Sequence, residues 1–244
     1  MKVIHDFHMH TFRSDGKSTI EENVIKAIES GLEIIAITDH GPGHIFFGIK
    51  EKQILDLRKE VDRLNEKYDN VKILLGIEAN ILGVDGSLDV SDTINENIDI
   101  LLAGYHFGSK PKKFFRDFKI HLYNYLGKRF KYFRKKIKKN NTLSLINAMK
   151  NYNIDILTHP GDKGQVDIQK VAKAALKTKT VLEINKRHKF LTVDQLKEIK
   201  DYPINFVISS DAHHFSEIGE YDNPLYRVEK SKLDIKKVIN IRKD

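Results

Sequence analysis

The chain of 244 residues is 40% hydrophobic and 31% charged with a formal net charge of +8, a composition ordinary for a soluble globular protein. No segment approaches the roughly 20 apolar residues of a membrane-spanning helix, and no signal-type apolar region follows Met1, so we expect a cytoplasmic protein. The absence of cysteine excludes disulfide bonds, thiolate metal ligands and redox chemistry at sulfur.

Strand and helix patterns alternate along the chain. Seven apolar runs rich in β-branched residues indicate strands, most of them too unbroken to have a solvated face, which is typical of buried parallel strands. The runs span residues 3–7, 34–38, 71–77, 98–103, 154–158, 181–184 and 206–209. Helical patterns occupy residues 19–30, 51–67, 143–151, 167–177 and 193–200. We expect the first helix to begin at a capping box of Ser18 and Glu21 and to end at Gly31.

This alternation predicts a single α/β domain over residues 1–244 whose strands close into a barrel. An open doubly wound sheet is the alternative. However, the first run is not followed by the Gly-x-Gly-x-x-Gly sequence that a nucleotide-binding fold of that kind carries. The sequence contains no internal repeat and no interdomain linker.

Histidines and carboxylates follow the apolar runs. Nine such side chains stand at or just after the ends of six runs: His8, His10, Asp15, His40, Glu78, His106, His159, Asp211 and His213. In a β/α barrel the carboxyl ends of the strands converge on one face, so these nine side chains are expected to meet. Imidazole and carboxylate are the ligands of Zn, Mn and Fe, and nine can hold two or three ions. Asp6 is expected to lie behind His8 and His10 and to support these ligands.

Seven short motifs occur in order along the chain: Asp6-Phe-His-Met-His-Thr11, Ser14-Asp-Gly16, Ile37-Thr-Asp-His-Gly41, Gly76-Ile-Glu-Ala-Asn80, Ala103-Gly-Tyr-His106, Thr158-His-Pro-Gly161 and Ser210-Asp-Ala-His213. In this order they resemble the motifs of the PHP domain, a family named for polymerase and histidinol phosphatase. The resemblance covers most of the chain and looks closest to the small stand-alone PHP phosphatases. It implies a distorted seven-stranded (β/α)7 TIM-like barrel with a trinuclear metal site that hydrolyses phosphate esters.

The resemblance also implies how three divalent ions share the nine ligands. The first ion is held by His8, His10, Glu78 and Asp211. Glu78 bridges to a second ion, which His106 and His159 also hold. The third ion is held by Asp15, His40 and His213. Some family members have histidine in place of Asp15, and a carboxylate there favours Mn or Fe relative to Zn, so all three metals remain candidates.

The expected reaction is hydrolysis of a small phosphomonoester. Metal coordination lowers the pKa of a bound water toward about 7, so a metal-bound hydroxide is the expected nucleophile. Asp39 is a candidate for relaying a proton to the leaving group, and a positioning role is its alternative. Candidates for contacting the substrate are the basic residues Arg13, Lys186 and Arg187 and the loop histidines His44 and His188.

Residues 110–140 form a basic, aromatic-rich insert. They contain 13 of the 42 Lys and Arg residues, one acidic residue and eight of the 22 Phe and Tyr residues. Apolar residues spaced by three or four predict one or two amphipathic helices that act as a lid or packing insert: Phe114, Phe118, Leu122, Leu126, Phe130, Phe133 and Ile137. Interleaved cations and aromatic rings also suit nucleic acid, and a membrane surface is a third alternative.

Several functions therefore stay open beside the phosphatase. A nuclease or nucleotide phosphoesterase would use residues 110–140 to hold its substrate, and histidinol phosphate is one substrate that the resemblance suggests. The non-enzymatic alternative is a binding module whose metals are structural. A complete ligand set at an open barrel mouth favours an enzyme, because structural metal sites are usually closed.

Overall fold

A computed structural model describes residues 1–110 and 134–242 of the chain. In this part of the chain seven parallel strands form one sheet, and each strand pairs with the next along the sequence. They are β2 (His5–Met9), β3 (Ile34–Ile37), β4 (Lys72–Asn80), β5 (Ile100–Gly104), β6 (Ile156–Leu157), β7 (Val181–Asn185) and β8 (Phe206–Ser209). Parallel neighbours need a crossover connection, and a helix lies in each crossover between these strands.

The chain directly after β8 closes the sheet against β2. The Asp211 backbone N–H donates to the His8 carbonyl (2.9 Å), and the His10 N–H donates to the Ala212 carbonyl (2.8 Å). Met9 and Ala212 form a parallel bridge at the same place. These contacts confirm the predicted seven-stranded barrel and exclude the open doubly wound sheet.

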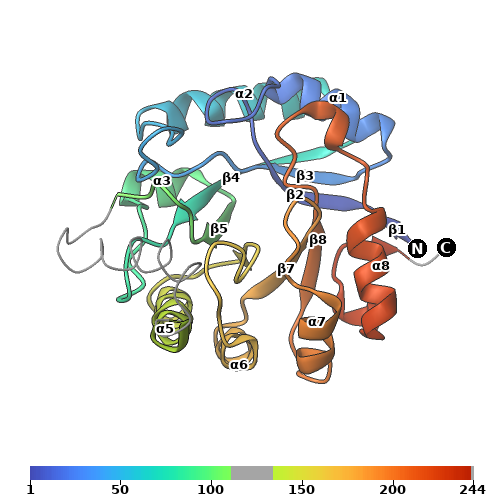
Figure 1. The fold of residues 1–244 in the computed structure, drawn as a ribbon. Helices are drawn as coiled ribbons and strands as arrows, with labels where there is room; N and C mark the ends of the chain where they lie inside the picture. The colour runs from blue at the N-terminus through green and yellow to red at the C-terminus, as the bar shows by residue number, and fades with distance from the viewer. Residues whose placement is uncertain (111–133, 243–244) are drawn as a thin grey trace.

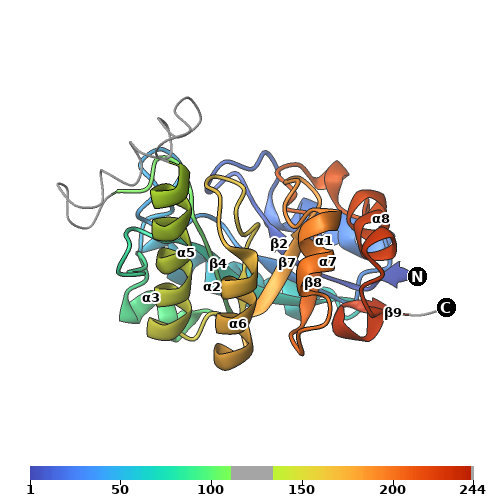
Figure 2. The same cartoon turned by 60° about the horizontal axis from the view of Figure 1, so that its bottom comes forward.

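Helices surround the strands on the outside of the barrel. They are α1 (Ile20–Glu29), α2 (Gln53–Lys67), α3 (Asp92–Asn97), α5 (Arg134–Asn151), α6 (Ile168–Thr178), α7 (Val193–Ile199) and α8 (Asp222–Ser231). Figure 1 shows α1 and α2 on one side of the strands and α5, α6 and α7 on the opposite side. In Figure 2 the last three helices stand next to one another in chain order. Among the helices of residues 1–110 and 134–242, none combines the length and hydropathy that crossing a bilayer requires.

Alternate residues of β5 face two different apolar clusters. Leu101 and Ala103 belong to a large cluster that includes residues of the surrounding helices. Leu102, between them, packs with Ile156 and Val207 in a separate small cluster. Because successive strand residues point to opposite faces, the small cluster lies inside the barrel and the large one between strands and helices. The barrel interior is therefore a packed core and not a channel.

The strands and helices predicted outside residues 110–140 are all present, with shifted ends. Strand β4 runs on to Asn80, so Glu78 lies within the strand and not after it. The structure adds α3, α8 and an antiparallel pair of short strands, β1 (Lys2–Val3) and β9 (Ile241–Arg242), that the sequence pattern did not indicate. This pair brings the two ends of the chain together (Figure 1). Of the predicted insert, residues 111–133 lie outside the described residues, and residues 134–140 begin α5.

Thr19, and not Ser18, caps the amino end of α1. Thr19 Oγ1 accepts a hydrogen bond from the Glu22 N–H (3.1 Å), and Glu22 Oε2 accepts from the Thr19 N–H (2.7 Å). The predicted capping box of Ser18 and Glu21 is therefore wrong by one residue. Ser18 Oγ is buried and instead accepts from the Phe215 N–H (2.8 Å). Both positions have a hydroxyl followed three residues later by Glu, so the local pattern cannot choose between them.

Candidate metal centre

The predicted ligands gather at the carboxyl ends of the barrel strands. Within the described residues, four groups of His, Asp and Glu have ligand atoms that lie within 4.8 Å of one another. These groups contain all nine predicted ligands and one further residue, His188. Residues far apart in sequence therefore meet because parallel strands end on one face of the barrel.

The first set of ligands consists of His8, His10, Asp211 and Glu78. His8 Nε2 lies 3.1 Å from His10 Nε2, and Asp211 Oδ1 lies 3.3 Å from His10 Nε2 and 3.7 Å from His8 Nε2. Glu78 Oε1 is 3.4 Å from His8 Nε2. All four side chains are almost completely buried. With metal–ligand bonds of about 2.0–2.2 Å, donors around one tetrahedral ion lie roughly 3.4 Å apart, so this spacing suits a metal ion.

The second and third sets have the same spacing. In the second set Glu78 Oε1 lies 3.1 Å from His106 Nε2 and 3.0 Å from His159 Nε2, and the two ring nitrogens are 3.3 Å apart. Glu78 therefore belongs to both the first and the second set.

In the third set Asp15 Oδ2 lies 3.4 Å from His40 Nε2 and 3.2 Å from His213 Nε2. His10 Nδ1 is 3.6 Å from Asp15 Oδ1. This set is more exposed than the other two, since Asp15 and His213 are only partly buried. The third set is therefore the one that solvent and a ligand reach most easily.

In the first two sets, the far ring nitrogens of His8 and His106 are occupied, so their other ring nitrogens face the neighbouring predicted ligands. His8 Nδ1 lies 2.7 Å from Glu183 Oε1, so the ring donates there. His106 Nδ1 donates to Asn80 Oδ1 (2.9 Å), whose amide nitrogen in turn donates to Asp89 (2.6 Å). In a neutral ring held this way, Nε2 carries the lone pair and faces the other ligands. A cation between these lone pairs satisfies them, so the residues fit a metal ion.

Electrostatics in the centre favour ionised carboxylates. Burial alone would raise the pKa of Glu78, but the charge of neighbouring imidazoles such as His8 holds that pKa well below its ordinary range. Burial lowers the pKa of His106 to about 3, so this ring is neutral and can act as a ligand. Burial opposes protonation of His40 too, yet Asp15 and Glu78 raise its pKa to about 10. Without metal, protons compensate the buried carboxylates, and divalent ions can take their place.

Comparison with known proteins agrees with this geometry. The sequence matches the PHP domain over residues 6–226, a range that includes all nine predicted ligands. The chain belongs to the PHP domain family.

Relatives of this PHP protein match it over nearly its whole length. It is 30% identical over 261 residues to a probable phosphatase of Caldanaerobacter subterraneus subsp. tengcongensis, covering 100% of this chain and 89% of that protein. A probable phosphatase of Shewanella sediminis is 31% identical over 255 residues, with 98% and 90% covered. The solved histidinol phosphate phosphatase of Lactococcus lactis subsp. lactis, complexed with zinc, L-histidinol and phosphate, is 19% identical, with a TM-score of 0.63 and 96% and 92% covered. The last comparison concerns the fold alone.

Two predicted ligands, His159 and Asp211, have a left-handed backbone, which is unusual for residues other than glycine. The φ angle is 27° at His159 and 54° at Asp211. The His159 N–H donates to Glu183 Oε2 (2.8 Å), and the Asp211 N–H donates to the His8 carbonyl. These hydrogen bonds stabilise conformations that cost on the order of 1 kcal/mol or more each.

Glu183 and Asn80 are supporting residues that the sequence pattern did not single out. Glu183 lies inside β7, is fully buried, and contacts both the His8 ring and the His159 backbone. Burial would raise its pKa, but the neighbouring His8 lowers it. A signal was present in the sequence, because a carboxylate inside an unbroken apolar run is costly without a partner.

Asp6 and Asp39 contact backbone and hydroxyl groups. Asp6 accepts from the His8 N–H (3.2 Å) and from the Tyr221 hydroxyl (2.8 Å), so Glu183 and not Asp6 holds the His8 ring. Asp39 Oδ1 accepts from the Thr11 N–H (2.7 Å) and Asp39 Oδ2 from the Thr11 hydroxyl (2.7 Å). Asp39 Oδ1 also accepts from the Ser14 hydroxyl (2.5 Å). These hydrogen bonds of Asp39 therefore hold the loop that carries Asp15 in place.

The three basic substrate-contact candidates form ion pairs with carboxylates of neighbouring elements. The pairs are Arg13 with Glu60 (3.7 Å), Lys186 with Glu220 (2.7 Å) and Arg187 with Glu217 (3.4 Å). Their charges are therefore already compensated within the protein. The guanidinium of Arg13 also lies over the Phe12 ring, 5.1 Å from its centroid.

The two loop histidines lie closer to the centre. The His44 ring stacks on His40 at a centroid distance of 5.0 Å. The centroids of the His188 and His159 rings are 4.7 Å apart, and His188 Nε2 is 3.4 Å from Asp211 Oδ2. The structure therefore brings these two residues to the ligands.

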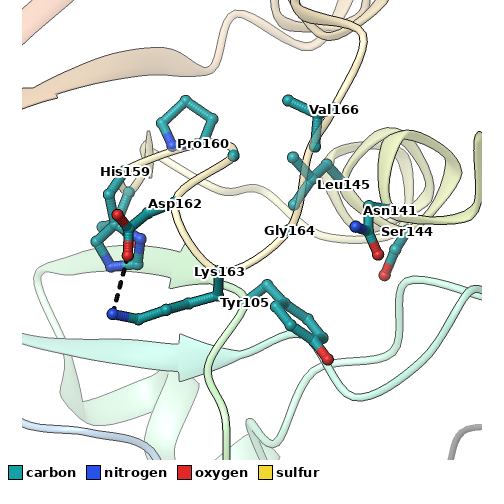
Figure 3. Close-up of a pocket in the computed structure, with 12 residues that line it drawn as sticks. Tyr105, Asn141, Ser144, Leu145, His159, Pro160, Asp162, Lys163, Gly164 and Val166 are labelled. Carbon is teal, nitrogen blue, oxygen red and sulfur yellow. Dashed lines mark ion pairs between the residues drawn. The ribbon is translucent and has the colours of Figure 1, made fainter. Parts of the chain in front are cut away.

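A small pocket lies beside His159. Figure 3 shows it between α5 and the loop that follows β6, with Tyr105 on a third side. Its volume of about 10 Å³ suffices for roughly one water molecule. Asp162 and Lys163 form an ion pair of 2.8 Å at its edge (Figure 3). This pocket is too small for a substrate.

Proposed function

We propose that this PHP protein is a metal-dependent phosphatase that hydrolyses a small phosphomonoester at a centre of three divalent ions. The observation that carries the proposal is the grouping of nine imidazole and carboxylate donors into three sets joined by Glu78. Similarity to probable phosphatases over nearly the whole chain supports the same reaction class.

Divalent ions held by these residues would lower the pKa of a coordinated water to about 7 and would compensate charge on the phosphoryl oxygens. The chain's own part is to hold the donors in place. Glu183 fixes the His8 ring, Asn80 fixes the His106 ring, and Asp39 holds the loop of Asp15. Because both Asp39 oxygens already accept hydrogen bonds, its contacts support a positioning role over proton transfer to the leaving group.

The donor chemistry supports zinc or manganese, with iron as a third choice. Six imidazoles and three carboxylates, in a chain without cysteine, make a set that suits borderline divalent ions. Asp15 adds a carboxylate to the third set, which favours the harder ions Mn and Fe at that position. Elemental analysis of protein purified without chelator should find two to three such ions per chain.

A substrate panel tests the proposed reaction. Metal-reconstituted protein should hydrolyse phosphomonoesters such as p-nitrophenyl phosphate and histidinol phosphate faster than the diester bis-p-nitrophenyl phosphate. A variant with His8→Ala and His10→Ala should lose at least one ion together with that activity, while His214→Ala, which replaces a partly buried histidine outside the three sets, should retain both. Activity that persists in the double variant, or at most one ion in the active protein, would contradict the proposal.

A nuclease or other polyanion-binding function is the second candidate. Lys135, Lys136, Lys138 and Lys139 of α5 line a hollow together with Lys170 of α6. Such a row of cations suits a phosphate backbone. An oligonucleotide in the substrate panel tests this candidate directly, since hydrolysis faster than that of the monoesters would favour it.

A further inference from the structure

His188 is not one of the nine predicted metal ligands, but the structure places it beside two of them, His159 and Asp211. It lies on the loop between β7 and α7, partly buried, with its Nε2 atom 3.4 Å from Asp211 Oδ2. One ligand atom from each of His159, His188 and Asp211 lies within 4.8 Å of the others. The donor set, two imidazoles and one carboxylate, is the type that binds Zn, Mn or Fe.

The His188 ring is oriented as the rings of the ligand histidines are. Its Nδ1 atom lies 3.0 Å from Asp162 Oδ2, which can only accept when ionised. His8 Nδ1 faces Glu183 Oε1 (2.7 Å) in the same way. A carboxylate behind one ring nitrogen is the usual support of a metal-bound histidine, because it fixes the ring and leaves the second nitrogen for the ion.

The opposite ring nitrogen then faces another acceptor. When the neutral His188 ring donates from Nδ1 to Asp162, its Nε2 atom carries a lone pair. That lone pair meets Asp211 Oδ2, an atom that already accepts from the Asn185 amide (3.1 Å). His188 Nε2 and Asp211 Oδ2 are then two acceptors 3.4 Å apart with no proton between them, and a cation that contacts both would satisfy them.

The loop that carries His188 is also held in place. The buried Arg227 side chain of α8 donates to the backbone carbonyls of Lys189 (3.2 Å) and Leu191 (2.9 Å), and it also contacts the Asn185 carbonyl. The His188 N–H donates to Asn185 Oδ1 (2.8 Å). A ligand on a loop needs such fixed geometry, since the ordering of a free loop would weaken metal binding.

We propose that His188 is a tenth ligand of the metal centre, binding an ion with His159 and Asp211, and that Asp162 orients its ring. The proposal rests on the metal centre of the proposed function and adds one coordinating residue to it. The loop between β7 and α7 is thereby a part of the metal site.

Competition for zinc tests the proposal. The zinc-loaded full-length protein is titrated with a chromogenic zinc chelator, and zinc per chain is measured by elemental analysis after gel filtration. His188→Ala should raise the Kd of one ion by at least about tenfold, and Asp162→Asn should raise it by a smaller factor. Lys189→Ala, which removes an exposed side chain from the same loop, is the matched control and should bind zinc as the unmodified protein does.

Zinc binding by both His188→Ala and Asp162→Asn that equals that of the unmodified protein would overturn the proposal, even if turnover falls. Thermal unfolding of the zinc-loaded variants shows whether each is folded. If His188→Ala does not fold, the zinc affinity of Asp162→Asn alone decides the test. This zinc-binding measurement does not depend on whether the protein hydrolyses phosphoesters. A protein that binds zinc through His188 but hydrolyses no phosphoester would contradict the proposed function and leave this inference standing.

Discussion

Glu78 is the residue on which the geometry of the centre depends most. Its Oε1 atom contacts ring nitrogens of His106, His159 and His8, and its Oε2 atom lies 3.1 Å from His40 Nδ1 and 3.7 Å from His10 Nε2. One carboxylate thus touches imidazoles of all three sets. Its position inside β4, paired in register with Leu102 of β5, fixes the direction of the side chain.

Replacing Glu78 should therefore damage the centre more than replacing Asp15. We expect Glu78→Gln to lower kcat by at least about 100-fold, because two ions lose a ligand, and Asp15→Asn to lower it by roughly tenfold, because two imidazoles still hold that ion. Steady-state kinetics on a small aromatic phosphate measures both. Equal losses in two variants of equal stability would argue against the bridging position of Glu78.

Glu183 should act on the metal through His8. Glu183→Gln keeps the size of the side chain but removes the charge that polarises the His8 ring, so zinc affinity should fall by about 10- to 100-fold. Chelator competition measures this change. Glu198→Gln, an exposed carboxylate on α7, is the control and should bind zinc normally. Unchanged affinity in Glu183→Gln would mean that the ring is held well enough by its packing.

At the scale of elements, strands and loops hold their ligands by different means. His8 and Glu78 lie within β2 and β4, so the ladders of the barrel fix their backbone. His159 and Asp211 lie on loops and rely on hydrogen bonds from their backbone N–H groups. The loop after β7 relies on the side chain of Arg227. Loop ligands consequently depend on side chains that are distant in sequence.

The capping box of α1 offers a test at this scale. Thr19→Ala removes the hydroxyl that accepts from the Glu22 N–H and should lower the free energy of unfolding by about 1 kcal/mol. Thr93→Ala, an exposed threonine inside α3, should change it by less than about 0.5 kcal/mol. Urea unfolding of the metal-loaded protein measures both values. A Thr19→Ala variant as stable as Thr93→Ala would contradict the observed cap.

At the scale of the whole molecule, the proposed metal binding should be coupled to folding. In the metal-free protein, burial opposes protonation of His40, but Asp15 and Glu78 raise its pKa to about 10. A raised histidine pKa stabilises the fold fully below the unfolded pKa of about 6.5, and this stabilisation is lost as the pH rises through about 10.

The Tm in the presence of a chelator should therefore fall between pH 7 and pH 10. Zinc-saturated protein should show a smaller fall over the same range, because its ions and not protons compensate the carboxylates. Thermal unfolding by circular dichroism at several pH values measures both slopes. Equal slopes with and without zinc would contradict this linkage.

The uneven charge of the molecule leads to a prediction about polyanions. If α5 contacts nucleic acid, affinity for a single-stranded oligonucleotide should fall with a log–log salt slope of about 0.7 per neutralised phosphate. Charge reversal at Lys135, Lys136, Lys138 and Lys139 should then abolish that binding and leave turnover of a small aromatic phosphate nearly intact. Fluorescence anisotropy at several salt concentrations measures the slope. Binding that neither salt nor these variants affect would contradict a polyanion contact at α5.

The sequence by itself determined the barrel and where its polar residues gather. Unbroken β-branched runs specify buried strands, and polar groups that directly follow them fall at one end of a parallel barrel, whichever helices lie between. His8, Glu78 and His159 could be chosen on this ground because run and ligand are adjacent in sequence. The amino-terminal cap of α1 is Thr19 and not the predicted Ser18, but the helix itself lies where the sequence predicted it.

Only the tertiary structure decided which side chains support the ligands. Glu183 stands inside its strand and not at the end. It reaches His8 because closure of the barrel leaves only β8 between β7 and β2. From the sequence, His188 and the cations Lys186 and Arg187 of the same loop were all candidates for contacting the substrate. The contacts of His188 with Asp162 and Asp211 distinguish it from the two cations. Periodicity is local, whereas a loop's conformation depends on residues far along the chain, such as Arg227, which only the closed barrel brings near.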